Sequence, residues 1–233
     1  MALIAWLSED KPEFPETDAS LSDPSGLLAA GGNLDQDTLC AAYFRGIFPW
    51  FTPDDPILWW APETRAILTA DSLRINRSNR KLIQRSKLRF SSNQQFEEVI
   101  HACADRPVDE RWIDSRMISS YIELHRSGIA HSIEAWRDDS LVGGLYGLTI
   151  GSIFCGESMF NREPNAAKLS FLTLAQTLFS QGFTMIDCQI QNPFLESMGV
   201  TEVKREQFEA LLYKSRCKRL SWPNIWQPQQ TDV

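Results

Sequence analysis

Three strand-like segments joined by very short links lie between residues 131 and 159. The segments cover residues 131–137, 141–149 and 152–159, and the links are centred on Asp138-Asp139 and on Ile150-Gly151. Links this short can reverse the chain between antiparallel strands, whereas a parallel crossover needs a dozen or more residues. The pattern therefore predicts an antiparallel meander, and any fold of this chain has to be built around it.

Helical patterns flank the predicted meander along the sequence. Apolar residues recur at helical spacing in residues 92–104 and 115–127, and further helices are expected over 165–181 and 204–216. A strand over residues 183–192 precedes the last helix. This order predicts an α+β fold with a mainly antiparallel sheet flanked by helices. It is close to the order of elements in GNAT-type acyltransferases.

A segment rich in proline and tryptophan precedes this region. Residues 49–62 contain four prolines and three tryptophans in 14 residues, a composition that excludes a regular helix. The pattern changes after Pro62, which predicts a small N-terminal domain, residues 1–62, and a GNAT-like domain, residues 63–233. Trp50 stands beside a turn and is the best candidate in this segment for a stacking platform.

The strand over residues 183–192 carries the candidate catalytic residues. Alternation along a strand places Asp187 and Gln189 on one face and Cys188 on the other. Strand ends that face a crevice are where α/β folds tend to place their chemistry. The alternative is that both polar side chains bind loops and hold the strand in register. Glu157 lies among apolar neighbours at the end of the meander, and a buried carboxylate needs a partner.

A basic segment, residues 74–90, interrupts an otherwise acidic chain. It carries seven Lys and Arg and no acidic residue, which gives it a net charge of +7. The whole chain has a net charge of −7, so the rest of the chain carries −14. Arg77, Arg80, Lys81 and Arg85 recur at helical spacing and would form one stripe. A solvated surface is the alternative, but such surfaces normally mix charge signs. The stripe therefore favours binding of a polyanion.

Several function classes find no support in the sequence. The five cysteines are widely spaced without a C-x-x-C pair, as expected of reduced thiols in the cytoplasm, and the histidines lack the spacing of metal ligands. There is no apolar run of membrane-spanning length and no G-x-S-x-G motif. The R/Q-x-x-G-x-G/A loop with which GNAT enzymes hold coenzyme A is also absent. A larger polyanion such as RNA fits this combination as the acyl carrier.

Five motifs resemble those of the bacterial leucyl/phenylalanyl-tRNA–protein transferases. They are LLAAGGNL (27–34), AYFRGIFPWF (42–51), PILWWAP (56–62), FCGESMF (154–160) and IDCQIQN (186–192). The resemblance implies transfer of Leu or Phe, with Met as a further candidate, from aminoacyl-tRNA to an N-terminal Arg or Lys of a protein. This transfer creates an N-degron of the N-end rule pathway. We expect no cofactor, no metal, no membrane partner, a monomer and a cytoplasmic location.

The resemblance also implies roles for individual residues. Asp187 would orient Gln189, which receives or relays a proton from the attacking amine. Trp50 and Trp112 would hold the terminal adenosine of the tRNA, as base stacking suggests. The basic stripe would contact the acceptor stem. The substrate pocket would be formed by Tyr121, Leu145, Phe154, Glu157, Met159 and Ile186.

Two other functions remain open from the sequence. An N-acetyltransferase that uses acetyl-coenzyme A would share the order of elements, and a coenzyme A titration separates it from the aminoacyl hypothesis. A non-catalytic RNA-binding module would explain the basic stripe but not the apolar pocket beside Asp187 and Gln189. Intact tRNA binding without transfer would favour that module.

Overall fold

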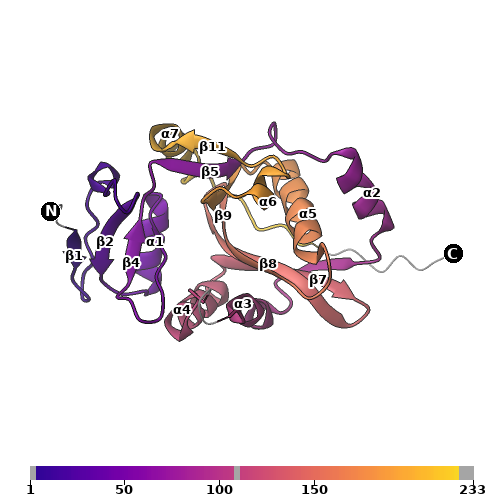
Figure 1. The fold of residues 1–233 in the computed structure, drawn as a ribbon, viewed down its shortest axis with the longest axis horizontal. Coiled ribbons are helices and arrows are strands. Elements are labelled where there is room, and N and C mark those ends of the chain that lie inside the picture. Colours follow the sequence, from indigo (N-terminus) through magenta and orange to yellow (C-terminus); the bar gives the residue numbers. More distant parts are fainter. Residues whose placement is uncertain (1–3, 108–110, 226–233) are drawn as a thin grey trace.

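The computed structural model describes residues 4–107 and 111–225, which form two β-sheets placed side by side along the long axis (Figure 1). The smaller sheet has the order β1 (Ala5–Leu7), β2 (Leu27–Gly31), β4 (Leu58–Trp60), β3 (Phe48–Pro49), and α1 (Gln36–Phe44) packs beside it. A short 3-10 helix, Thr17–Ala19, lies between β1 and β2. None of the helices in the described ranges is long and apolar enough to cross a membrane.

The larger sheet contains the predicted meander. Its order is β11 (Thr201–Lys204), β5 (Thr64–Leu68), β10 (Met185–Gln189), β9 (Ile153–Asn161), β8 (Ser140–Ile150), β7 (Ala130–Arg137), β6 (Arg89–Ser92). Strands β7, β8 and β9 pair antiparallel, with Ile133 opposite Leu145 and Leu145 opposite Met159. Only β9 and β10 pair parallel in this sheet as described. The prediction of a mainly antiparallel α+β fold is therefore confirmed.

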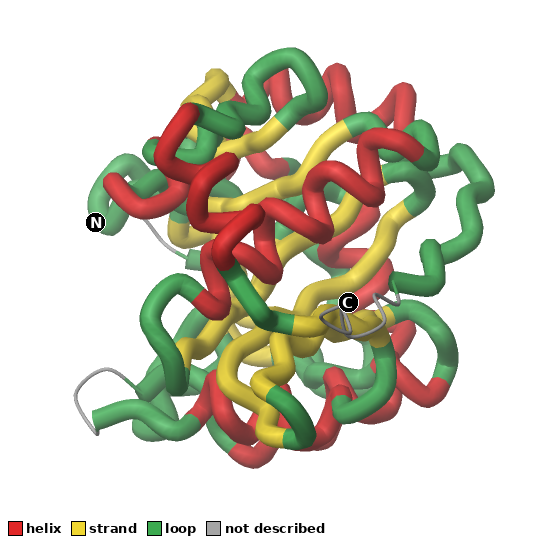
Figure 2. Tube along the Cα trace, turned by 90° about the vertical axis from the view of Figure 1, so that its right-hand side faces the viewer, coloured by secondary structure: helices red, strands yellow, loops and turns green. Residues whose placement is uncertain are grey.

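Helices cover both faces of the larger sheet, which Figure 2 shows from the side. On one face lie α3 (Phe96–Ala104) and α4 (Ser115–Arg126), and on the other lies α5 (Ala166–Ser180). Neighbouring residues of β8 face opposite layers: Tyr146 belongs to the apolar cluster that includes Phe96 of α3, whereas Leu145 belongs to the cluster that includes Leu172 of α5. The remaining helices are α2 (Arg77–Arg85), α6 (Pro193–Glu196) and α7 (Arg205–Ser215).

The segment rich in proline and tryptophan forms β3, β4 and the loops around them. The Trp59 indole is fully buried and donates to the carbonyl of Gly31 at 2.9 Å. One continuous apolar cluster includes Trp59 and Ile47 together with Tyr146 and Met185 of the larger sheet. The chain passes from one sheet to the other between β4 and β5, and its division into two domains at residue 62 stays a prediction.

Candidate active site

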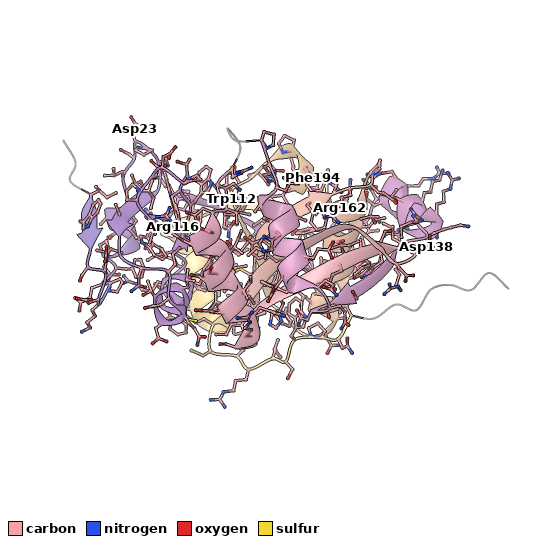
Figure 3. All side chains as sticks on the ribbon, turned by 90° about the horizontal axis from the view of Figure 1, so that it is seen from below. Asp23, Trp112, Arg116, Asp138, Arg162 and Phe194 are labelled. Atoms are coloured by element: carbon pink, nitrogen blue, oxygen red, sulfur yellow. The ribbon has the colours of Figure 1, made fainter. Side chains whose placement is uncertain are left out.

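A cavity of about 530 Å³ lies where β3 and its following loop meet β8, β9, α5 and the segment after β10. Trp112 and Phe194, which are labelled in Figure 3, both belong to its wall. The wall has an apolar part and a polar part, and β9 contributes residues to both. This division allows one substrate to place an apolar side chain and a reacting polar group in the same cavity.

The apolar part of the wall consists of large side chains on the face of the larger sheet that α5 covers. Leu145 of β8 and Phe154 and Met159 of β9 line it, as expected from the sequence. Phe171 of α5 and Leu195 of α6 complete it, and neither was singled out from the sequence. Ile186, in contrast, is fully buried in the adjoining apolar cluster and does not line the cavity.

The polar part of the wall is centred on Glu157 of β9. One carboxylate oxygen accepts from the Tyr121 hydroxyl at 3.1 Å and the other from Gln189 Nε2 at 2.8 Å. The Tyr121 hydroxyl also bonds to that of Tyr43 of α1 at 2.5 Å. Tyr121 is itself buried and does not line the cavity, but it contacts two residues of the wall: it donates to Glu157 and packs edge-on against the Tyr146 ring, with centroids 5.6 Å apart.

The Glu157 carboxyl is the group of this wall that titrates near neutral pH. Burial raises its pKa from 4.5 to about 7, and the carboxylate of Asp187 adds to the increase. Hydrogen bonds from the two tyrosines and from Gln189 act in the opposite direction, because they favour the ionised form. A carboxyl with a strongly shifted pKa at a cavity wall is a common mark of a functional site.

Asp187 lies behind the cavity wall and is only 1 % exposed. It forms a two-point ion pair with Arg65 of β5, at 2.8 Å and 2.7 Å. Its Oδ1 also accepts from the backbone N–H of Gln189 at 3.0 Å. The expected link from Asp187 to Gln189 therefore exists through the backbone, while the Gln189 side chain faces the cavity and Glu157.

The predicted alternation of β10 is wrong at its end. The pairing of β10 with β5 shifts register between Asp187 and Gln189, and Gln189 has φ +59°. The irregularity lets Cys188 and Gln189 line the same cavity, although strict alternation would place them on opposite faces.

The two candidate adenosine-binding tryptophans stand on the cavity wall from different elements. Trp50 is 42 % exposed and stacks at a tilt on Trp60, with ring centroids 5.6 Å apart, while Trp60 Nε1 donates to the Trp50 carbonyl at 2.6 Å. Trp112 precedes α4 and lines the same cavity. The Trp50 ring is thus held by a neighbour while one face stays available to a ligand.

The basic stripe forms α2, as the sequence predicted. Asn76 caps the helix by accepting from the Asn79 N–H, and the stripe residues, Arg77, Arg80, Lys81 and Arg85, are all exposed. The helix lies at the end of the molecule farthest from the smaller sheet (Figures 1 and 3) and contributes no residue to the cavity wall. Its role in binding a polyanion stays a prediction.

Two residues of the polar network were not identified from the sequence. Tyr43 was seen only as part of the apolar face of a helix. Arg65 offered a signal, because it stands alone in the apolar strand Thr64–Leu68 and a buried charge requires a partner. Its partner, 122 positions away, could not be read from the sequence. In the described ranges no group of three or more His, Cys, Asp or Glu side chains is placed to hold a metal ion.

An α+β fold with an apolar pocket beside a titratable carboxyl and an amide can hold an apolar side chain next to a reacting polar group, as an enzyme that transfers an aminoacyl group must. Comparison with known proteins supplies the family. The family model for leucyl/phenylalanyl-tRNA protein transferase matches residues 67–213, and that for the N-terminal domain of the same transferase matches residues 32–63. The chain belongs to the leucyl/phenylalanyl-tRNA protein transferase family.

Relatives of the same name cover almost the whole chain. The leucyl/phenylalanyl-tRNA–protein transferase of Shewanella piezotolerans is 47% identical over 228 residues, 97% of this chain and 96% of its own. That of Pectobacterium carotovorum subsp. carotovorum is 47% identical over 225 residues, 96% of this chain and 95% of its own. The solved structure of L-PGS from Bacillus licheniformis shares 12% identity and a TM-score of 0.40, over 73% of this chain and 56% of that one.

Proposed function

We propose that this chain transfers Leu or Phe from aminoacyl-tRNA to the N-terminal Arg or Lys of acceptor proteins in the cytoplasm, acting as a monomer. The observation that carries the proposal is the cavity itself, with an apolar part beside Gln189 and Glu157, in a chain of this family. The product is a protein with a new N-terminal residue, an N-degron. Phe171 and Leu195 limit the pocket that receives the donor side chain, which suits unbranched-β residues such as Leu and Phe.

The chemistry needs little activation from the protein. The α-amine of the acceptor attacks the ester carbonyl, the C–N bond forms, the C–O bond to the ribose breaks, and the amine proton ends on the ribose hydroxyl. An α-amine with a pKa of about 7.7–8 is partly neutral at physiological pH. Holding amine and ester together contributes up to roughly 7–11 kcal/mol in well-oriented cases. Positioning is therefore the main task of the site.

Gln189 and Glu157 supply the polar contacts at the reacting centre. Since Gln189 Nε2 donates to Glu157, the amide oxygen of Gln189 is the atom that accepts a hydrogen bond from the incoming amine. Glu157, with a pKa of about 7, is the group one hydrogen bond away that can take up a proton near neutral pH. Asp187 acts on Gln189 from behind the wall and does not touch the substrate.

The tRNA would be held at two places. Trp50 and Trp112 stack on the terminal adenosine, a contact worth about 1–3 kcal/mol for one base. The stripe Arg77, Arg80, Lys81 and Arg85 on α2 attracts the acceptor stem and makes binding dependent on salt.

Transfer of labelled Leu or Phe to a peptide that starts with Arg tests the proposal. We expect product only with charged tRNA, and none after ribonuclease treatment or with an N-acetylated peptide. Replacing the donor by acetyl-coenzyme A tests the acetyltransferase alternative, for which the comparisons give no support. Binding of tRNA without transfer of any residue would refute the enzyme and favour an RNA-binding module.

A further inference from the structure

Arg65 is a buried arginine of β5 whose guanidinium uses all its nitrogens on two separate parts of the molecule. Nε and Nη2 donate to the two oxygens of Asp187 at 2.8 Å and 2.7 Å. Nη1 donates to the carbonyl of Gly46 at 3.0 Å. The group also lies over the rings of Phe48 and Phe208, 4.6 Å from each centroid. These contacts hold the guanidinium in one place. The groups to which it is hydrogen-bonded are therefore held in place as well.

On the side of β10, the contact with Arg65 continues to the amide that lines the cavity. Asp187 Oδ1 accepts from Arg65 and also from the backbone N–H of Gln189. Gln189 has φ +59°, a left-handed conformation that a residue with a Cβ adopts only when its surroundings hold it there. This conformation points the Gln189 side chain at Glu157, 2.8 Å away.

On the other side, the contact reaches the opposite wall of the cavity. Gly46 lies in the turn after α1, and Phe48, Pro49 and Trp50, which begin two residues further on, line the cavity. Phe48 is in addition one of the two rings that enclose the guanidinium. The same side chain therefore fixes the wall that carries Trp50 and the wall that carries Gln189.

We propose that Arg65 is a positioning residue for aminoacyl transfer, which sets Gln189 in its left-handed conformation through Asp187 and sets the distance from Gln189 to the wall of Trp50. This inference rests on the proposed function of the cavity. A misplacement of about 1 Å in a reacting group lowers turnover by about 10²-fold, so the arginine acts on the rate without touching substrate.

The competing explanation is that Arg65 only stabilises the core, and a double-mutant cycle separates the two. The variants are Arg65→Lys, which keeps the charge but loses the fork, Gln189→Ala, and the double variant, each assayed with Phe-tRNA and an Arg-starting peptide. We expect Arg65→Lys to lower kcat by about 10²-fold with the KM for Phe-tRNA changed by less than about threefold. When Arg65→Lys is added to Gln189→Ala, we expect kcat to fall by less than about threefold, because the amide that Arg65 positions is gone.

Two outcomes overturn the proposal. The first is a kcat of Arg65→Lys equal to that of the wild type. The second is a decrease in kcat on adding Arg65→Lys to Gln189→Ala that is as large as the decrease in the wild type. That result would show that Arg65 acts independently of Gln189. Absence of transfer by the wild-type protein, in contrast, refutes the proposed function and leaves the cycle without a reaction.

A second pair of variants covers the case in which Arg65→Lys does not fold. Asp187→Asn keeps an oxygen that can accept from the Gln189 N–H but weakens the pair with Arg65. It replaces Arg65→Lys in the double-mutant cycle with Gln189→Ala, and the same changes in kcat are expected. Arg205→Lys is the matched control, because Arg205 also joins distant segments, donating to the carbonyls of Thr17 and Ala61, but is not part of the cavity. We expect Arg205→Lys to lower the melting temperature while kcat stays that of the wild type.

Discussion

Replacement of Glu157 by Gln should change how the stability of the protein depends on pH. The carboxyl has a pKa of about 7 in the folded protein, against 4.5 as its ordinary value. A Gln side chain has nearly the same shape and keeps one oxygen to accept from Gln189. Its amide N–H can donate to the Tyr121 hydroxyl, which accepts as well as donates. The variant therefore removes a titration with little change in packing.

The size and sign of the effect follow from the two pKa values. Below pH 4.5 Glu157 is neutral in both the folded and the unfolded chain. Its contribution to the free energy of unfolding is then at its largest. Between pH 4.5 and 7 the unfolded chain releases the proton while the folded protein keeps it, so the free energy of unfolding falls as the pH rises. A difference of 2.5 pKa units corresponds to about 3 kcal/mol. This is an upper value, because the carboxyl stands at a cavity wall that water reaches.

Urea denaturation of both proteins at several pH values between 4.5 and 8.5 measures the effect. We expect the free energy of unfolding of Glu157→Gln, minus that of the wild type, to rise by about 3 kcal/mol from pH 4.5 to pH 8 and to stay constant above it. All other groups titrate in both proteins and cancel in the difference. A difference that does not change with pH would refute the shifted pKa of Glu157, and with it the role of this carboxyl as proton acceptor.

Five further variants, at four residues, test the other parts of the site. Arg80→Ala and Arg85→Ala should each reduce the slope of log K against log salt for tRNA binding by about one unit, and an unchanged slope would remove α2 from the tRNA surface. Trp50→Ala should raise the KM for Phe-tRNA by about tenfold or more, and Trp50→Phe by much less, in steady-state assays. Asp187→Ala should lower the free energy of unfolding by about 3–5 kcal/mol, because Arg65 is left buried and unpaired. A loss below about 1 kcal/mol in urea denaturation would contradict the buried pair.

The parts of the fold that the sequence predicted are those set by local residues. The meander follows from its two short links, and β7, β8 and β9 pair as expected. The start of α4 follows from Asp114, whose carboxylate accepts from the Met117 N–H. The basic stripe lies along one helix because its residues recur at helical spacing, and this helix begins where the Asn76 side chain caps it. In each case the determinant and the element lie within a few residues of each other.

The geometry at Gln189 could not be predicted in this way. No glycine marks the left-handed position, and the residues around it read as a regular strand. The conformation is held by Asp187, which is held by Arg65 from 122 positions away. A pattern of period two contains no information about such a partner. The error in the predicted alternation therefore falls where tertiary contacts override the local preference.

The buried ion pair of Arg65 and Asp187 lies behind the cavity wall, where an apolar pair could stand instead. Two apolar side chains of similar volume in place of Arg65 and Asp187 would often make a protein as stable or more stable, because removing two charges from water is costly. An apolar pair has no direction, however, and would not fix the backbone N–H of Gln189 or the carbonyl of Gly46. The ion pair makes two hydrogen bonds within itself and two to the surrounding backbone, one on each side of the cavity, and leaves little freedom on either side. Since the proposed reaction depends on the placement of an amine and an ester, we interpret the pair as serving positional accuracy in this protein, at some expense of stability.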